Sequence, residues 1–349
     1  MSKDSYTWQE IVSQPQAWRA TLETFAAGRV ALESFLERAD FDQLLVVGCG
    51  STHYLAQAAA AILTHRARVP ARAFPASELW LFSDLALARQ PLLLAISRSG
   101  TTTETLWAVE RFRQVYGGPV LAVTCYPESP LAHQADFALV APDAQEHSVA
   151  QTRSFTSMLL LTQALAAVLA RDEGMLERLH GLPNALENVV ARVGDWPRQL
   201  GMDLDVERFY VLGGGPLYGV ACEAMLKLKE MTLSYSEAYH PLEFRHGPMS
   251  MVNGHTLIVG LLSDTGLAAE VRLLKDMKEL GAHTLALVED GSSFTGWRAD
   301  HVVALHSGLD EWERVPLYLP VMQHMAYHRA MAKGLDPDRP TNLTAVVEL

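Results

Sequence analysis

Short uninterrupted apolar runs alternate along this chain with longer segments in which apolar residues recur at helical spacing. The runs lie at residues 43–47, 91–96 and 209–212, and a helix-like segment follows each of them. A short apolar run bounded by turn residues is typical of a strand that is buried on both faces of a parallel sheet. Strands of this kind that alternate with helices predict an α/β fold.

The pattern also repeats. The glycine turn at residues 48–52 matches a turn that begins at Gly213, 165 positions after Gly48. The apolar run that ends at Gly100 matches one that ends at Gly266, 166 positions later. A third pair is formed by residues 120–124 and 284–288. Three matches at nearly one spacing predict a duplicated unit, with a parallel sheet flanked by helices in each copy.

These patterns divide the 349 residues, enough for about two domains of ordinary size, into five segments. We expect an N-terminal helical segment, a first α/β domain, a helical linker, a second α/β domain and a C-terminal tail. Their expected bounds are residues 1–40, 41–172, 173–205, 206–333 and 334–349.

The most informative segment follows the run at 91–96. Residues 97–103, which we name the hydroxyl loop, carry five hydroxyl side chains, Arg98 and Gly100, and they open a predicted helix. The first amides of a helix lack intrahelical partners and its dipole favours negative charge, so this loop predicts a seat for a phosphate or another dianion. A helix cap is the alternative, but one or two hydroxyls would suffice for it. In the second copy Asp264 replaces Arg98, and its carboxylate would repel a phosphate, so we expect one seat per chain.

Composition excludes several classes of partner. Hydrophobic residues make up 49% and charged residues 19% of the chain, as in packed globular proteins. The net charge of −12 argues against nucleic acid and against a basic membrane-surface helix. The N-terminus shows no signal peptide, and no uncharged apolar run approaches the ~20 residues of a membrane span. We expect a soluble cytoplasmic protein with no membrane partner, in which the three separated cysteines are free thiols.

No cofactor is expected either. Neither copy carries the GxGxxG pattern of dinucleotide sites or the GxxxxGK[ST] pattern of phosphate-binding loops in nucleotide hydrolases. His324 and His328 form an HxxxH pair, but no acidic partner motif accompanies them, so we predict no metal site.

A second group of candidates follows the glycine turn at Gly213. Glu223, Lys227 and Glu230 would share one face of a helix, at i, i+4 and i+7. An exposed ladder of ion pairs is the usual explanation of such spacing. Here, however, the helix begins at the edge of the sheet where ligands bind, and its other residues are mostly small or apolar. The three residues are therefore candidates for acid–base catalysis.

Two histidines come next along the chain. His246 lies between Arg245 and Gly247 in a segment that Pro248 ends, so we expect it in a loop, where it could contact a ligand or transfer a proton. His240 precedes a proline and is the weaker candidate.

Taken together, these segments resemble the sugar isomerase (SIS) domain family. The similarity runs almost end to end, and it is closer to the isomerase half of glutamine:fructose-6-phosphate amidotransferase and its short deaminase, isomerase and deglycase relatives. It is carried by residues 10–15, 48–52, 97–102, 227–230, 236–239, 245–248 and 334–340. The resemblance implies two flavodoxin-like SIS domains.

The resemblance also implies roles for the candidate residues. The ligand would be a hexose 6-phosphate or an aminosugar 6-phosphate, held by hydroxyls with Arg98 beside them. Glu230 would move a proton between C1 and C2 of the open-chain sugar, with Lys227 and Glu223 in support. His246 would assist ring opening and arrive from the other subunit of a homodimer with shared active sites. The phosphate-binding hydroxyls would be those of Ser51, Thr52, Ser97, Ser99 and Thr102.

Two departures from the amidotransferase bear on the reaction. The chain begins at the isomerase half, with no cysteine near residue 2, so transfer of an amide from glutamine is not expected. Ala345 stands where the amidotransferase has a lysine that forms an imine with the keto-sugar. We therefore expect an isomerase that releases an amine from an aminosugar 6-phosphate. A fructosamine-6-phosphate deglycase and a non-catalytic sugar-phosphate sensor are the alternatives.

Overall fold

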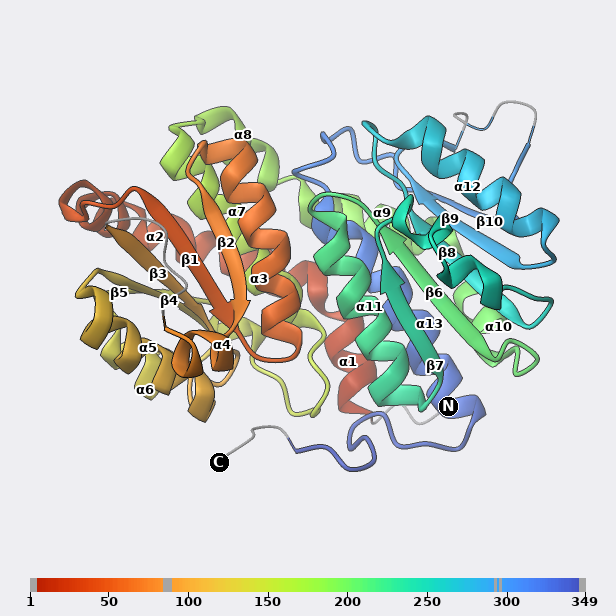
Figure 1. Cartoon of the computed structure of the whole chain (residues 1–349), viewed down its shortest axis with the longest axis horizontal. Helices are drawn as coiled ribbons and strands as arrows, with labels where there is room; N and C mark the ends of the chain where they lie inside the picture. The colour runs from red at the N-terminus through yellow and green to blue at the C-terminus, as the bar shows by residue number, and fades with distance from the viewer. Residues whose placement is uncertain (1–4, 84–89, 292–293, 295–296, 345–349) are drawn as a thin grey trace. The chain divides into compact units, whose positions relative to one another are not determined.

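The computed structural model describes residues 5–83, 90–291, 294 and 297–344 of the chain. These residues form two parallel sheets of five strands, and Figure 1 shows helices on both faces of each sheet. The predicted α/β fold with a duplicated unit is therefore confirmed. Ala345, which stands where the resemblance places an imine-forming lysine, lies outside the described residues.

The two sheets have the same topology. The first contains β1 (Gln43–Gly48), β2 (Ala71–Pro75), β3 (Pro91–Ile96), β4 (Val120–Thr124) and β5 (Phe137–Val140). The second contains β6 (Arg208–Gly213), β7 (Tyr235–Tyr239), β8 (Thr256–Leu261), β9 (His283–Val288) and β10 (His301–Ala304). Their orders, β2-β1-β3-β4-β5 and β10-β9-β8-β6-β7, are one order read from opposite edges. This is the flavodoxin-like arrangement, in which ligands bind where the direction of winding reverses, between β1 and β3 or between β6 and β8.

Helices cover both faces of the first sheet because its central strands are buried throughout. One face packs against side chains of α4 (Ala76–Leu81), α5 (Thr103–Tyr116) and α6 (Pro130–Gln134). The other packs against α3 (Ser51–Ile62) and α7 (Arg153–Ala170), with α2 (Gln14–Arg38) against α7 (Figure 1). Short helical segments complete this part at η1 (Leu63–Ala67), η2 (Pro142–Ala144) and α8 (Glu173–Leu179).

The second sheet is covered in the same way. α12 (Leu267–Glu279) and Phe244 of η3 (Glu243–Arg245) pack against one face. α11 (Leu217–Thr232) covers the other face, and α13 (Tyr318–Ala332) packs against α11 and α10 (Trp196–Met202). The remaining elements are α1 (Tyr6–Val12), α9 (Leu182–Val193), η4 (Pro248–Met251) and η6 (Val315–Leu317).

The helical segment expected over residues 1–40 divides between two compact units. One unit contains residues 5–11, 148–150 and 184–343, and the other contains residues 12–147 and 151–183. Trp8 of α1 packs against Tyr327 and His328 of α13, with ring centroids 5.0 and 5.4 Å apart. Trp18 of α2 instead donates a hydrogen bond from Nε1 to Thr156 Oγ1 of α7, at 2.9 Å. Each unit therefore gains helices from outside its own α/β repeat.

Among the described helices, one matches a membrane span in length and hydropathy. α7 has the length and hydropathy to cross a bilayer, but 78% of it is buried inside the protein. A helix that is apolar on all sides and packed against a sheet is the core helix of its domain. Its position between α2 and the first sheet accounts for its composition.

Both glycine turns depend on close backbone approaches. A Cβ atom on Gly48 would lie 2.5 Å from the carbonyl of Thr52, and one on Gly213 would lie 2.7 Å from the carbonyl carbon of Leu217. Gly50 and Gly215 then have positive φ angles of 55° and 54°, which favour glycine. The two turns therefore share a close backbone approach and a glycine with positive φ, although only the first carries hydroxyl side chains at its end.

Candidate active site

The hydroxyl loop joins β3 to α5 and is held in shape by its own side chains. The Gly100 amide donates a hydrogen bond to Ser97 Oγ at 3.1 Å, and this oxygen lies 3.1 Å from Thr102 Oγ1. The amide and the hydroxyl of Thr101 donate to Ser99 Oγ at 3.2 and 2.9 Å. The structure thus gathers the predicted phosphate-binding hydroxyls of Ser97, Ser99 and Thr102 at the start of α5, where the helix dipole favours an anion.

The first glycine turn presents Ser51 and Thr52 at the start of α3. Thr52 Oγ1 accepts a hydrogen bond from the Cys49 amide at 2.9 Å and donates one to the Cys49 carbonyl at 3.0 Å. Both hydroxyl residues are buried. Because the Thr52 proton already points at the Cys49 carbonyl, a bond from this hydroxyl to phosphate would require the proton to turn. Phosphate binding by Ser51 and Thr52 stays a prediction.

Arg98 has a buried partner that the sequence did not reveal. Its Nη1 donates to Glu146 Oε2 at 3.3 Å, and the side chains are 8% and 0% exposed. Glu146 also accepts hydrogen bonds from the amides of Thr152 and Ser154, at 2.7 and 3.1 Å, and from their hydroxyls. The main-chain carbonyl of Arg98 accepts bonds from Thr124 Oγ1 and the Cys125 amide. The Arg98 side chain is therefore held by a carboxylate, and a direct phosphate contact stays a prediction.

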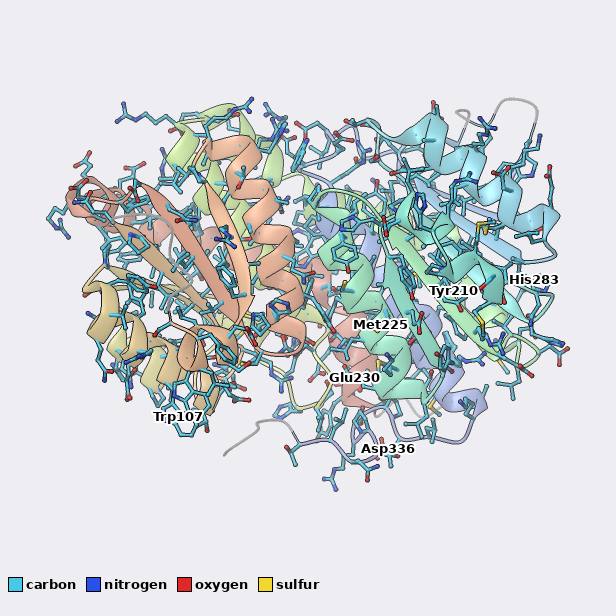
Figure 2. All side chains as sticks on the ribbon, viewed as in Figure 1. Trp107, Tyr210, Met225, Glu230, His283 and Asp336 are labelled. Atoms are coloured by element: carbon cyan, nitrogen blue, oxygen red, sulfur yellow. The ribbon has the colours of Figure 1, made fainter. Side chains whose placement is uncertain are left out.

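The predicted acid–base group is assembled on α11. Lys227 Nζ lies 3.0 Å from Glu223 Oε1 and also donates a hydrogen bond to Glu230 Oε1. The side chains of Glu223 and Lys227 are fully buried, whereas that of Glu230 is 14% exposed. Glu230 lies near the C-terminal end of α11 in Figure 2. Of the two carboxylates, Glu230 is thus the one that a solvent-borne molecule can reach.

Two carboxyl groups and one amine meet in this trio. Burial disfavours the charged form of Lys227, but the carboxylates of Glu223 and Glu230 outweigh this cost and raise the pKa of Lys227 above its usual value. The ammonium therefore stays charged at neutral pH and orients both carboxylates. An exposed ladder of ion pairs, the alternative explanation of the spacing, is excluded because two of the three side chains are buried.

The histidines of the following segment have different surroundings. His246 is exposed directly after η3, and its amide donates to the Glu243 carbonyl at 2.9 Å. His240 stacks on Tyr218 with ring centroids 3.9 Å apart and an angle of 17° between the rings. Burial lowers the pKa of His240, so this ring is neutral at physiological pH. Both residues are exposed, but the His240 ring is held against Tyr218, whereas His246 lies in the loop that the sequence predicted.

The segment 236–239, part of the resemblance, forms most of the edge strand β7. Glu237 accepts hydrogen bonds from the hydroxyls of Tyr235 and Tyr239, at 3.1 and 2.6 Å. The hydrogen bond that Tyr239 donates to Glu237, together with burial, raises the pKa of Tyr239 to about 12. In the part of the chain that the structure describes, no three His, Cys, Asp or Glu side chains are grouped so as to hold a metal ion.

Comparison with protein families identifies the two repeated units. The SIS domain model matches residues 39–168 and again residues 204–332. The chain belongs to the SIS domain family. The glutamine–fructose-6-phosphate aminotransferase of Neisseria meningitidis serogroup B is 29% identical over 97% of this chain and 58% of its own length. This SIS protein therefore spans a little over half of that relative.

Two solved structures resemble this chain over nearly its whole length. The glucosamine-6-phosphate deaminase of Thermotoga maritima is 29% identical, with a TM-score of 0.81 over 99% of this chain and all of the deaminase chain. The tagatose-6-phosphate ketose/aldose isomerase of Escherichia coli is 25% identical, with a TM-score of 0.84 over 97% of this chain and 95% of the isomerase chain.

The second SIS domain contains a counterpart of the hydroxyl loop at residues 263–266, which we name the counterpart loop. The Gly266 amide donates to Ser263 Oγ at 2.9 Å, just as Gly100 donates to Ser97. Asp264, however, pairs with the buried Arg314, whose Nη1 donates to Oδ2 at 2.8 Å and whose Nη2 donates to Oδ1 at 2.5 Å. The Asp264 carboxylate is therefore paired with a guanidinium that also lies 3.7 Å from Glu289 Oε2.

Two glutamates that contact these loops were not predicted from the sequence. Glu146 binds Arg98 in the first SIS domain, and Glu311 binds the counterpart loop in the second. They stand 165 positions apart, the spacing that separates Gly48 from Gly213. Each glutamate lies in a connecting segment that has no motif of its own. The repeat spacing is therefore the one feature of the sequence that could have pointed to them.

Proposed function

We propose that this SIS protein is a phosphosugar isomerase and aminosugar-6-phosphate deaminase. The hydroxyl loop and the first glycine turn bind the 6-phosphate, and Glu230 transfers a proton between C1 and C2 of the open-chain sugar. The observation that carries the proposal is the trio on α11, where a partly exposed carboxylate is fixed by a buried ammonium. Interconversion of an aldose and a ketose needs a base next to the carbonyl carbon, and Glu230 has the chemistry for it.

The reaction balances without a redox partner. Glu230 removes the C2 proton of an open-chain 2-amino aldehyde, and the C1 oxygen gains a proton as the C1–C2 enol forms. Return of the proton to C1 leaves an imine at C2. Water adds to this imine and ammonia leaves, which gives the 2-keto sugar phosphate. With a 2-hydroxy aldose the same two proton transfers give the ketose directly, and no amine is released.

The remaining residues have supporting roles in the proposal. Lys227 holds the Glu230 carboxylate in one orientation, and Glu223 compensates the charge of the buried Lys227. His246 shuttles the ring-opening proton, and its exposure suits a side chain that completes the site of a second subunit in a homodimer. We expect the enzyme to act in the cytoplasm.

The test is release of amine from three candidate substrates. Glucosamine 6-phosphate and galactosamine 6-phosphate should yield ammonia and a ketose 6-phosphate, and the Glu230→Gln variant should yield neither. Release of lysine from fructoselysine 6-phosphate alone would instead support a deglycase. Tight binding of a hexose phosphate with no turnover of any substrate would contradict the proposal and support a sensor.

A further inference from the structure

Two segments that carry the resemblance have no role in the proposed reaction. They are residues 10–15, where α1 ends and α2 begins, and residues 334–340, which follow α13. Both bind the connection between β5 and α7, at residues 141–152. Each of them therefore contacts the part of the chain that carries Glu146, the partner of Arg98.

The two ends of this connection are tied to each other. Glu146 Oε1 accepts hydrogen bonds from the amide and the hydroxyl of Thr152, at 2.7 and 2.8 Å. Arg153 Nε donates to the Gln145 carbonyl at 3.1 Å. Residues 147–151 are therefore the tip of a closed loop, and we name them the tip segment.

Glu10 of α1 holds the tip segment at Ser148. The Ser148 amide donates to Glu10 Oε1 at 3.3 Å, and the Ser148 hydroxyl donates to Glu10 Oε2. Glu10 is 2% exposed and Ser148 is 1% exposed. A buried carboxylate needs hydrogen-bond donors, because without them its desolvation is costly. The two bonds therefore fix both the main chain and the side chain of Ser148.

The C-terminal segment holds the next residue of the tip. The Val149 amide donates to the main-chain carbonyl of Asp338 at 3.1 Å. The Asp338 carboxylate in turn accepts from the amide and the hydroxyl of Thr7 in α1, at 2.8 and 2.7 Å. The tip segment, α1 and the C-terminal segment thus form one hydrogen-bonded network, which Glu10 joins through its carboxylate.

We propose that Glu10 is a positioning residue for the phosphate seat, an inference that rests on the proposed function. By holding Ser148 it fixes the main chain two residues after Glu146, whose carboxylate in turn holds Arg98 of the hydroxyl loop. Thr152 binds that carboxylate directly, whereas Ser148 restrains the main chain that carries it. A seat whose donors are already in place binds its anion more tightly, since no free energy is then spent on ordering the loop.

The experiment measures binding of glucitol 6-phosphate to the full chain by calorimetry. This open-chain hexitol phosphate has no carbonyl and cannot be turned over. Ser148→Ala and Glu10→Gln should each weaken binding about fivefold or more, within the range of coupling between contacting residues. Thr256→Val is the matched control: it removes a buried hydroxyl of β8 that donates to Asn253, and it should leave the affinity unchanged.

Two further measurements separate positioning from a general loss of stability. In amine release from glucosamine 6-phosphate, the loss should appear in KM with kcat unchanged, as expected when binding weakens equally in the ground state and the transition state. In an Arg98→Met background the link from the tip segment to the hydroxyl loop is already broken. Ser148→Ala should then cause no further loss of affinity, whereas independent effects would add.

Unchanged affinity in the folded variants would overturn the inference, as would a fall in kcat with unchanged KM or full addition of the losses in the double variant. If Glu10→Gln does not fold, Ser148→Ala decides alone. If the wild type itself does not bind glucitol 6-phosphate, the proposed phosphate seat is wrong and the inference falls with it. Binding by the wild type together with unaffected variants overturns the inference alone.

Discussion

The guanidinium of Arg98 and the carboxylate of Glu146 form a buried pair, with 3.3 Å between Nη1 and Oε2. Arg98 belongs to the hydroxyl loop, and Glu146 follows the strand β5 at the far edge of that sheet. Breaking a buried pair by removing one partner costs about 3–5 kcal/mol, since the other charge is left without compensation. The pair therefore fixes the position of the loop at which phosphate is proposed to bind.

Replacement of Arg98 separates two roles for this residue. Arg98→Met should weaken binding of a hexose 6-phosphate by about tenfold or more, because the freed Glu146 carboxylate disturbs the loop; tenfold corresponds to about 1.4 kcal/mol. The measurement is the dissociation constant, by calorimetry. The double variant Arg98→Met/Glu146→Gln should recover most of the affinity. If it binds as weakly as Arg98→Met, Arg98 acts on the phosphate directly and the positioning role is wrong.

The two SIS domains provide a matched pair of hydroxyl variants. Ser99→Ala should weaken binding of the sugar phosphate about tenfold or more, since a hydrogen bond to a charged group contributes about 1.5–3 kcal/mol. Thr265→Val removes the corresponding hydroxyl of the counterpart loop, where Glu311 is bound, and should leave affinity unchanged. Equal losses in the two variants would contradict the assignment of the phosphate to the first SIS domain.

Stability should depend on pH through His324 of α13. Burial, with a smaller effect of His328, lowers the pKa of His324 from 6.5 to about 4. Between these values the unfolded chain binds a proton that the folded chain does not. The free energy of unfolding should therefore fall as the pH is lowered from 6.5 to 4, by up to about 3 kcal/mol.

Denaturant unfolding at several pH values measures this dependence. In His324→Gln the slope between pH 4 and 6.5 should become shallower, and in His283→Gln, which changes an exposed side chain at the start of β9, it should not. A slope in His324→Gln equal to that of the wild type would show that other groups cause the loss of stability.

Local sequence predicted most of the fold because the elements are locally encoded. The run at residues 91–96 is β3 to the residue, and the run at residues 120–124 is β4 to the residue. The strands are short apolar runs and the turns need glycine, so each of these elements can be recognised from a few consecutive residues. The sequence predicts one helical segment over residues 1–40, but its division between two units after Ile11 depends on packing partners far along the chain.

The environment of the candidate site was less predictable. The hydroxyl loop and the trio on α11 are marked by residue type and spacing. The partner of Arg98 is not, because Glu146 lies 48 positions away in a connecting segment. The sequence predicts that Asp264 repels an anion, but it does not reveal that Asp264 pairs with Arg314, 50 positions further along the chain. Such pairings depend on the tertiary structure, and in the sequence only the repeat spacing could indicate them.

The role of Glu230 can be tested by exchange of the sugar's own hydrogen with solvent. In deuterium oxide, the wild type should incorporate deuterium at C1 or C2 of a hexose 6-phosphate substrate, detected by NMR or mass spectrometry, since a base that transfers the proton also exchanges it. Glu230→Gln should bind the sugar phosphate with unchanged affinity and show no incorporation. Incorporation by Glu230→Gln at the wild-type rate would contradict the central claim that this carboxylate moves the proton.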